Sequence, residues 1–366
     1  MSENKPIQLG LCCLNTILRS QKPPVFASRK MIIRTIKEQG IEVLKEKILQ
    51  NLQDVLTMMD WNEENGIKVF RLSSELFPHM SNPKVKDYTF EFAKEHLIKI
   101  GEKSRIYNQR LTFHPGQYNV VGTPNKECFN QTINDLKYHA DVLDLINAGK
   151  DSVMVVHGGG VYGDKQETIK RWCLQYNLLP ENVKNRLVLE NCEKCFSIED
   201  CLTISEKVNI PVVFDTHHYN CYCKLHPAEI FLKPNEYMPR ILNTWHIRGI
   251  KPKFHVSEQG NGRIGHHSDY VEEIPEFLRE IYTKYGVAID IMIEAKMKEQ
   301  AIFKLYKKYP DLNCKQSKIN ITYNTPGIGW VKKHCIECKC CQALQKKKKL
   351  KIVKKLIITT PQLNNN

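Results

Sequence analysis

Eight short runs of β-forming residues alternate with longer amphipathic segments along this 366-residue chain. Strands that alternate with helices are the repeating unit of a parallel sheet. Eight such units predict a single (β/α)8 TIM barrel. A doubly wound open sheet would show the same alternation, and the alternation alone leaves it open. The predicted strands are 7–14, 67–71, 110–113, 152–156, 186–189, 211–214, 252–255 and 289–293.

The segments between the strands predict the outer helices. One of them opens with Ser197 followed three residues later by Asp200, which is typical of a capping box. The regular alternation ends near residue 310, so we expect a barrel domain over 1–310 and a basic, poorly ordered C-terminal extension over 311–366. The predicted helices are 34–59, 84–101, 127–148, 164–177, 197–207, 226–243, 270–285 and 297–308.

The positive charge of the chain is concentrated in this extension. The formal net charge is +14, and residues 331–366 contain ten Lys and one Glu, a net charge of +9 for that segment. Lys and Arg favour polyanionic partners because they displace counterions from phosphates. Charge of this size could also serve solubility alone, so it does not identify the partner.

The 14 Cys do not predict a disulfide scaffold, because they are a small share of a long chain that lacks the pattern of a secretory signal. The densest group is Cys335, Cys338, Cys340 and Cys341, beside His334. This spacing could hold zinc, but no second pair at the usual spacing follows, so free thiols are the favoured interpretation.

The absence of a run of 18 apolar residues predicts a soluble, intracellular protein with no membrane partner. We expect a monomer, which would be nuclear if the source is eukaryotic.

Six consecutive predicted strands end in His, Asp or Glu. In a barrel the C-terminal ends of the strands meet at one mouth, where the chemistry of such enzymes takes place. One such residue would be an ordinary polar strand terminus, but six at one mouth are costly to desolvate unless ions compensate their charge. The six residues are His114, His157, Glu190, Asp215, His255 and Glu294.

His218 and His267, in loops that follow the sixth and seventh strands, extend the set to eight candidate metal ligands. Neutral His with Asp and Glu suits Zn²⁺, Mn²⁺ or Fe²⁺. Eight ligands are too many for one ion, so we expect two or three divalent ions. Clustered metals are a common solution for phosphodiester hydrolysis, although sugar isomerisation on a two-metal barrel uses similar ligands.

The motifs at the strand ends resemble those of the UV damage endonuclease family. They follow one another in the family's order across residues 7 to 305. The resemblance implies a (β/α)8 enzyme that nicks damaged double-stranded DNA immediately 5′ to UV photoproducts and other lesions and leaves a 3′-hydroxyl. It also implies a cluster of divalent metals, Mn²⁺ or alternatively Zn²⁺. The matching stretches are "LGLCCLN", "FRLSSELFPH", "TFHPGQY", "VVHGGG", "LVLENCE", "VVFDTHHY", "KPKFHVS", "GHHSDYV" and "IMIEAKMKEQA".

Carried onto the matching positions, the resemblance makes all eight candidates metal ligands and gives catalytic roles to Lys253 and Glu294. Lys253 matches a lysine that, in the family, can be carboxylated and bridge metals. The choice of His218 over His217, and of His267 over His266, rests only on the family's spacing.

The resemblance also assigns lesion recognition to Asn15, Gln117 and Tyr118. A tyrosine can stack on an opened base step, which is easier to open where a photoproduct already weakens stacking. Asn15 could instead be a turn or cap residue, and Tyr118 an ordinary loop aromatic. The chain has Leu11 where the family often has an aromatic residue, which bears on the range of lesions it accepts.

Three other functions stay open at this point. An abasic-site endonuclease of the related zinc-barrel group is the main alternative, because "HPGQY", "LENCE" and "DTHH" occur there with variations. A sugar isomerase is disfavoured by the basic charge. A DNA-binding protein that keeps a structural metal core would be non-catalytic.

We predict that deleting residues 331–366 weakens binding to undamaged DNA and reduces the slope of log affinity against log salt, because ten lysines no longer displace counterions. Fluorescence anisotropy with an intact duplex at several salt concentrations measures both. An unchanged slope would refute a DNA-binding role for the extension.

Overall fold

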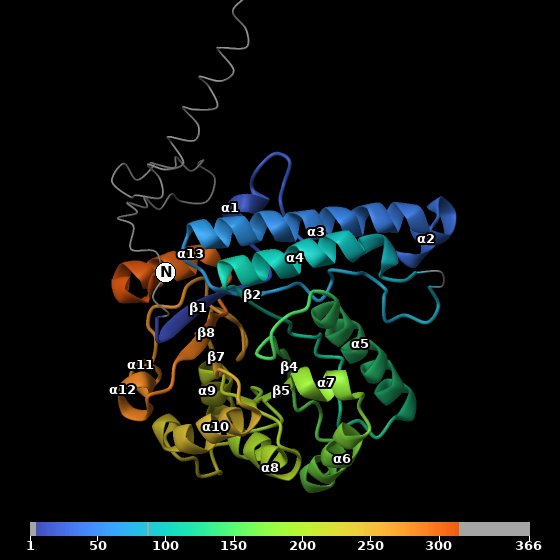
Figure 1. The fold of residues 1–366 in the computed structure, drawn as a ribbon. Coiled ribbons are helices and arrows are strands. Elements are labelled where there is room, and N and C mark those ends of the chain that lie inside the picture. Colours follow the sequence, from blue (N-terminus) through green and yellow to red (C-terminus); the bar gives the residue numbers. More distant parts are fainter. Residues whose placement is uncertain (1–4, 86–87, 315–366) are drawn as a thin grey trace, which may run out of the picture. The chain divides into compact units, whose positions relative to one another are not determined.

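The computed structural model describes residues 5–85 and 88–314, and all eight predicted strands are present among them (Figure 1). Each strand is short, and each is separated from the next by at least one helix. The strands are β1 (Ile7–Cys12), β2 (Val69–Arg71), β3 (Arg110–Thr112), β4 (Met154–His157), β5 (Leu187–Glu190), β6 (Val212–Val213), β7 (Lys253–Val256) and β8 (Ile289–Ile293).

The strands form a closed parallel ring. Five pair in the order β3-β2-β1-β8-β7 and three in the order β4-β5-β6. Single parallel bridges join these two sheets, Phe113 to Met154 and Asp215 to His255. The predicted TIM barrel is therefore confirmed, and the doubly wound open sheet is wrong, because an open sheet has two unpaired edges and this ring has none.

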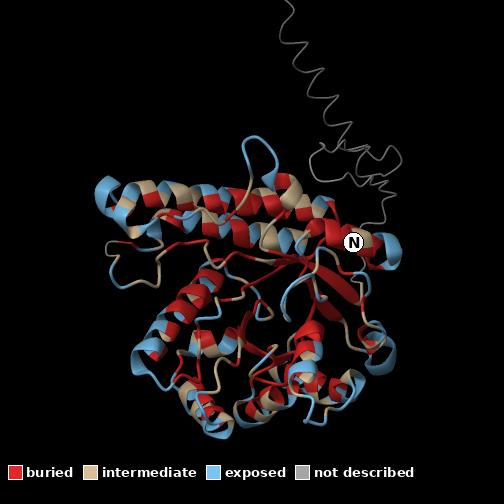
Figure 2. Ribbon diagram, turned by 180° about the vertical axis from the view of Figure 1, so that it is seen from behind, coloured by how far each residue is buried: buried red, intermediate tan, exposed pale blue. Residues whose placement is uncertain are grey.

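The helices surround the ring and turn their buried sides toward it (Figure 2). The longest is α3, and Figure 1 shows it beside α4. The helices are α1 (Thr16–Arg19), α2 (Ile33–Gln39), α3 (Ile41–Glu64), α4 (Lys94–Tyr107), α5 (Lys126–Leu145), α6 (Lys165–Asn177), α7 (Glu181–Arg186), α8 (Ile198–Val208), α9 (Thr216–Leu225), α10 (Pro234–Arg248), α11 (Glu276–Arg279), α12 (Ile281–Tyr285) and α13 (Glu299–Lys308), with 3-10 turns η1 (Glu91–Ala93) and η2 (Pro310–Leu312).

Four predicted helices differ from the observed ones. The predicted helix 34–59 is divided at Gly40, whose φ of 89° is not helical, into α2 and α3, and α3 continues to Glu64. The predicted helix 84–101 begins only at Lys94, after η1. The predicted helix 270–285 is replaced by the short helices α11 and α12. The predicted helix 226–243 is replaced by α9 and α10, because Asp215 accepts bonds from two backbone N–H groups and starts a helix directly after β6. The predicted capping box of Ser197 and Asp200 is confirmed.

The C-terminal predictions concern residues that the structure does not describe. The candidate zinc group around Cys335 and the lysine run lie outside the described residues, and the domain boundary at residue 310 stays a prediction. Among residues 5–85 and 88–314, every helix is too short or too polar to cross a membrane.

A buried ion triad lies inside the barrel near the N-terminal ends of its strands. Asp290 of β8 accepts from Arg110 of β3 at 2.7 Å and from Lys251 at 2.5 Å, and its side chain is 1% exposed. It lies two strand residues from Met292 and four from Glu294, so all three face the interior. The triad therefore satisfies the polar groups at one end of the barrel interior, while Glu294 belongs to the other end.

We predict that Arg110→Met lowers the free energy of unfolding by about 3–5 kcal/mol, because it leaves the buried Asp290 carboxylate without one of its two cations. Urea denaturation measures the change. Arg34→Met is the control, since Arg34 forms an exposed pair with Glu38, worth about 0.5 kcal/mol or less. Equal losses in the two variants would contradict a structural role for the triad.

Candidate metal centre

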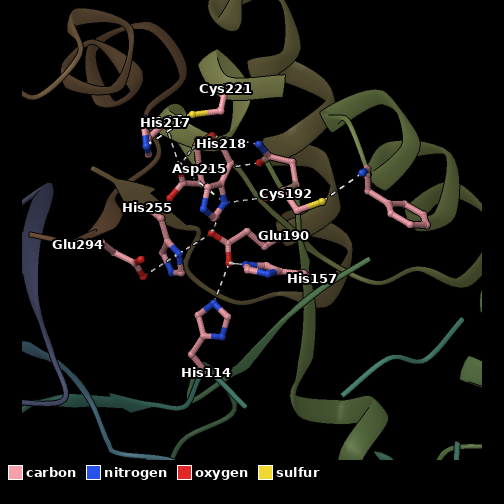
Figure 3. A network of polar contacts seen from close by, with 12 residues as sticks. His114, His157, Glu190, Cys192, Asp215, His217, His218, Cys221, His255 and Glu294 are labelled. Carbon is pink, nitrogen blue, oxygen red and sulfur yellow. Dashed lines mark hydrogen bonds and ion pairs between the residues drawn. The ribbon is translucent and has the colours of Figure 1, made fainter. Parts of the chain in front are cut away.

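Seven of the eight predicted metal ligands lie together at the C-terminal mouth of the barrel (Figure 3). Their ligand atoms form three groups, and within each group the atoms lie within 4.8 Å of one another. Glu190 belongs to two of the groups, and so does His255. The groups are His114, Glu190 and His255; His157, Glu190 and His218; and Asp215, His255 and Glu294.

The Glu190 carboxylate is the centre of the cluster. Its Oε2 lies 3.0 Å from Nε2 of His114 and 3.1 Å from Nε2 of His157, and its Oε1 lies 2.8 Å from Nδ1 of His255 and 3.6 Å from Nδ1 of His218. The side chain has no solvent exposure. Imidazoles from four other segments therefore surround one carboxylate.

Asp215 has one carboxylate oxygen in use and one without a partner. Oδ1 accepts from the backbone N–H groups of His217 and His218, both at 2.7 Å. Oδ2 is buried and has no hydrogen-bond partner. A buried, unpartnered carboxylate oxygen is costly unless a cation completes it. Together with the neighbouring His255 and Glu294, this oxygen fits a divalent metal ion.

The pKa values of the cluster residues also indicate that positive charge is favoured beside the carboxylates. Burial raises the pKa of Asp215 to about 7, against the opposing effect of His218. Burial alone would lower the pKa of His218, but Asp215 and Glu190 raise it to about 10. Burial also opposes ionisation of Glu190, yet His255 and His157 hold its pKa well below the usual value. The carboxylates of the site therefore favour positive charge close to them.

His267 lies at the edge of the cluster. Its Nδ1 is 3.9 Å from Oε2 of Glu294, its side chain is 30% exposed, and it belongs to none of the three groups. The neighbouring His266 is exposed and contacts Arg263 instead. Of the two histidines, His267 is the one beside a cluster carboxylate, and its role as a ligand stays a prediction.

His217 and His218 face different neighbours. His218 approaches Glu190 and Asp215, whereas the ring nitrogens of His217 lie 3.6 Å from the Cys221 sulfur (Figure 3). His218 and not His217 therefore lies beside the cluster carboxylates, and its role as a ligand stays a prediction.

Lys253 lies inside the barrel below the cluster. Its side chain is fully buried, and its Nζ contacts Nε2 of His255. Burial, followed by the nearby Arg71 charge, lowers the pKa of Lys253 to about 8. A substantial share of the amine is therefore neutral near pH 8, and the neutral form is the one that can react with carbon dioxide.

The predicted DNA-contacting residues have different surroundings. Gln117 is exposed, and Tyr118 is 64% exposed, on the loop that follows β3. Asn15 is fully buried and caps α1 through a bond from the Leu18 N–H, while its Nδ2 has no partner. Leu11 is fully buried in β1 and faces no solvent. Direct DNA contact by Asn15 and an effect of Leu11 on lesion range stay predictions.

Comparison with known proteins identifies the family. The model of the UV-endonuclease UvdE family matches residues 7–324. The chain belongs to the UvdE family. It is therefore an endonuclease. A relative from Acanthamoeba polyphaga mimivirus is 39% identical over 311 residues, which cover 84% of this chain and 92% of that protein.

Two further matches are consistent with this assignment. A protein of Schizosaccharomyces pombe named UV-damage endonuclease is 39% identical over 84% of this chain, and the match covers 52% of that protein, about half its length. The crystal structure of SacUVDE is 28% identical, with a TM-score of 0.72, and the match covers 84% of this chain and all of that one.

Two residues of this UvdE-family site were missed by sequence reasoning. Arg71 ends β2, pairs with Glu294 and lies 3.4 Å from the Cys13 sulfur. The side chain of Asn191 forms two hydrogen bonds with the backbone of Asp215. Its Oδ1 accepts from the Asp215 N–H at 2.9 Å, and its Nδ2 donates to the Asp215 carbonyl at 3.1 Å. Arg71 could have been found as the polar residue at the end of the second strand, whereas Asn191 carried no signal beyond following Glu190.

We predict that His218→Ala weakens Mn²⁺ binding by at least about tenfold, because it removes an imidazole from the cluster. His217→Ala is the matched control and should change the Mn²⁺ affinity by less than about twofold. Isothermal titration calorimetry measures the affinity, and thermal melting checks that both variants fold. Equal losses would contradict the assignment of His218.

Proposed function

We propose that this chain is a metal-dependent DNA repair endonuclease that nicks the backbone immediately 5′ to UV photoproducts, with other lesions as further substrates, and leaves a 3′-hydroxyl. The single observation that supports it best is the shared Glu190 carboxylate with its four imidazole neighbours, in a chain of the UvdE family. The names of the relatives support UV-damaged DNA as the substrate.

The proposed cofactors are two or three divalent ions, Mn²⁺ or alternatively Zn²⁺. Imidazole and carboxylate ligands suit both ions. The three overlapping groups support more than one ion, and all eight predicted residues are proposed as ligands. When bound, the ions would lower the pKa of an attacking water and neutralise the charge that develops on the phosphate.

The surrounding residues hold the ligands in place. Arg71 pairs with Glu294 and fixes the direction of its carboxylate. Asn191 holds the backbone of Asp215, and its carbonyl oxygen lies 3.0 Å from Nδ1 of His218, which orients that ring. Lys253 and Glu294 are proposed as catalytic residues, with Lys253 in reach of His255 for a carboxylated, metal-bridging form.

Lesion recognition is proposed for the loop after β3. Gln117 and Tyr118 are exposed there, two and three residues beyond the Pro115 that follows His114. An exposed tyrosine ring offers a face for base stacking next to the metal cluster. The exposure of Tyr118 favours this role over that of a buried packing residue.

We predict that the full-length protein with Mn²⁺ nicks a UV-irradiated duplex 5′ to the photoproduct, and that Glu294→Gln reduces the rate at least about a hundredfold while it largely preserves DNA binding. End-labelled UV-irradiated, abasic and intact duplexes, mapped on sequencing gels, measure this. Glu206→Gln on α8, in an exposed pair with Arg240, is the matched control and should retain the wild-type rate.

The pattern of products decides between the functions. Cleavage of the abasic duplex alone would favour the abasic-site endonuclease, and no nick on any of the three duplexes would refute both endonuclease functions. An undiminished rate in Glu294→Gln would contradict the role of the cluster.

A further inference from the structure

The segment between β7 and α11 contains an ordered loop, residues 258–268, that closes on itself. Gln259 and His267 form an antiparallel bridge, Gly260 N–H donates to the His266 carbonyl at 2.7 Å, and Ser268 N–H donates to the Glu258 carbonyl at 2.8 Å. The two ends of the loop are therefore held together at its base.

The Gln259 side chain fills the inside of this loop. Its Nε2 donates to the carbonyls of Gly260 and Arg263, at 2.7 Å and 3.1 Å, and its Oε1 accepts from the Gly265 N–H at 3.0 Å. Gly262 and Gly265 have φ values of 117° and 92°, which an L side chain rarely adopts. One amide and two glycines thus fix the shape of the tip.

The tip presents a cation and an aliphatic side chain to solvent. Arg263 is exposed, its Nε donates to Nε2 of His266 at 3.2 Å, and among the described residues no carboxylate forms an ion pair with it. Ile264 is 39% exposed beside it. An uncompensated guanidinium next to an exposed apolar side chain is the combination that binds a phosphate and contacts a base step.

The position of the loop in the barrel relates it to the Gln117–Tyr118 loop. The loops follow β7 and β3, which are four strands apart in a closed ring of eight, so they leave the mouth on opposite sides. The metal cluster lies between them, and the base of the 258–268 loop carries His267, 3.9 Å from Glu294. A duplex held at both loops would pass over the cluster.

We propose that the 258–268 loop is a second DNA-binding element, in which Arg263 binds a backbone phosphate and Ile264 packs against the base step opened at the lesion, across the mouth from Tyr118. This inference rests on the proposed function, because damaged DNA is the occupant of the mouth. The phosphate contact is independent of sequence and damage. The apolar contact requires an unstacked step, so Ile264 acts mainly on lesion-containing DNA.

Binding of two full-length variants tests the loop, in the Glu294→Gln background that prevents cleavage. Ile264→Ser should weaken binding to a photoproduct duplex about tenfold and to an intact duplex less than twofold. Arg263→Ala should weaken both to a similar extent and reduce the slope of log affinity against log salt by about 0.9, the value for one phosphate. Fluorescence anisotropy measures both, and 2-aminopurine beside the lesion reports base unstacking.

Matched controls lie at the C-terminal end of α4, which leads directly into β3 and is therefore at the end of the barrel opposite the mouth. Ile106→Ser replaces an isoleucine that is 77% exposed, and Arg105→Ala removes an exposed arginine. Both should bind as the parent does, and thermal melting checks that all four variants fold. The loop proposal is overturned if Ile264→Ser and Arg263→Ala match their controls while the wild-type enzyme nicks the photoproduct duplex. A wild-type enzyme with no preference for damaged DNA overturns the proposed function and the loop proposal together.

Discussion

The closed barrel and its mouth depend on one buried carboxylate. Glu190 contacts imidazoles on β4 and β7, in the loop directly after β3, and at the start of α9. Among the residues that the structure describes, the two sheets of the ring are joined by single bridges, between Phe113 and Met154 and between Asp215 and His255. The contact of Glu190 with His114 crosses the first junction, and its contact with His255 crosses the second. The polar cluster therefore adds side-chain contacts across the two junctions at which the strands are paired by a single bridge.

The same cluster concentrates charge that the protein alone balances imperfectly. Asp215 keeps an unpartnered buried oxygen, and the carboxylates raise the pKa of His218 to about 10. Buried charge of this kind is tolerated where cations pair with it or where it belongs to a catalytic site. Arg71 contributes a fixed positive charge next to Glu294, and Lys253 contributes one that is partly lost near its pKa of about 8. The divalent ions proposed above would complete the balance.

Asp215 has two roles, one in the local structure of α9 and one in the cluster. As the N-cap of α9 it satisfies two backbone N–H groups with one oxygen, which leaves the other free for the cluster. Asn191, the residue after β5, then fixes the backbone of Asp215. The helix cap and the candidate ligand are thus one side chain, which is why α9 begins immediately after β6 and not at residue 226 as the sequence pattern predicts.

The sequence by itself determined the eight strands and the six candidate ligands at strand ends, because strand periodicity and a polar residue at a strand end are local patterns. The same alternation predicted a barrel without excluding an open sheet, and the two bridges that close the ring decided between them. It also singled out Gln117 and Tyr118, which are exposed at the mouth. It did not predict the pairing of Arg71 with Glu294 or the position of the 258–268 loop opposite Tyr118. Only the closed ring decided these, because they join residues that lie far apart in the chain or depend on backbone hydrogen bonds that no periodicity records.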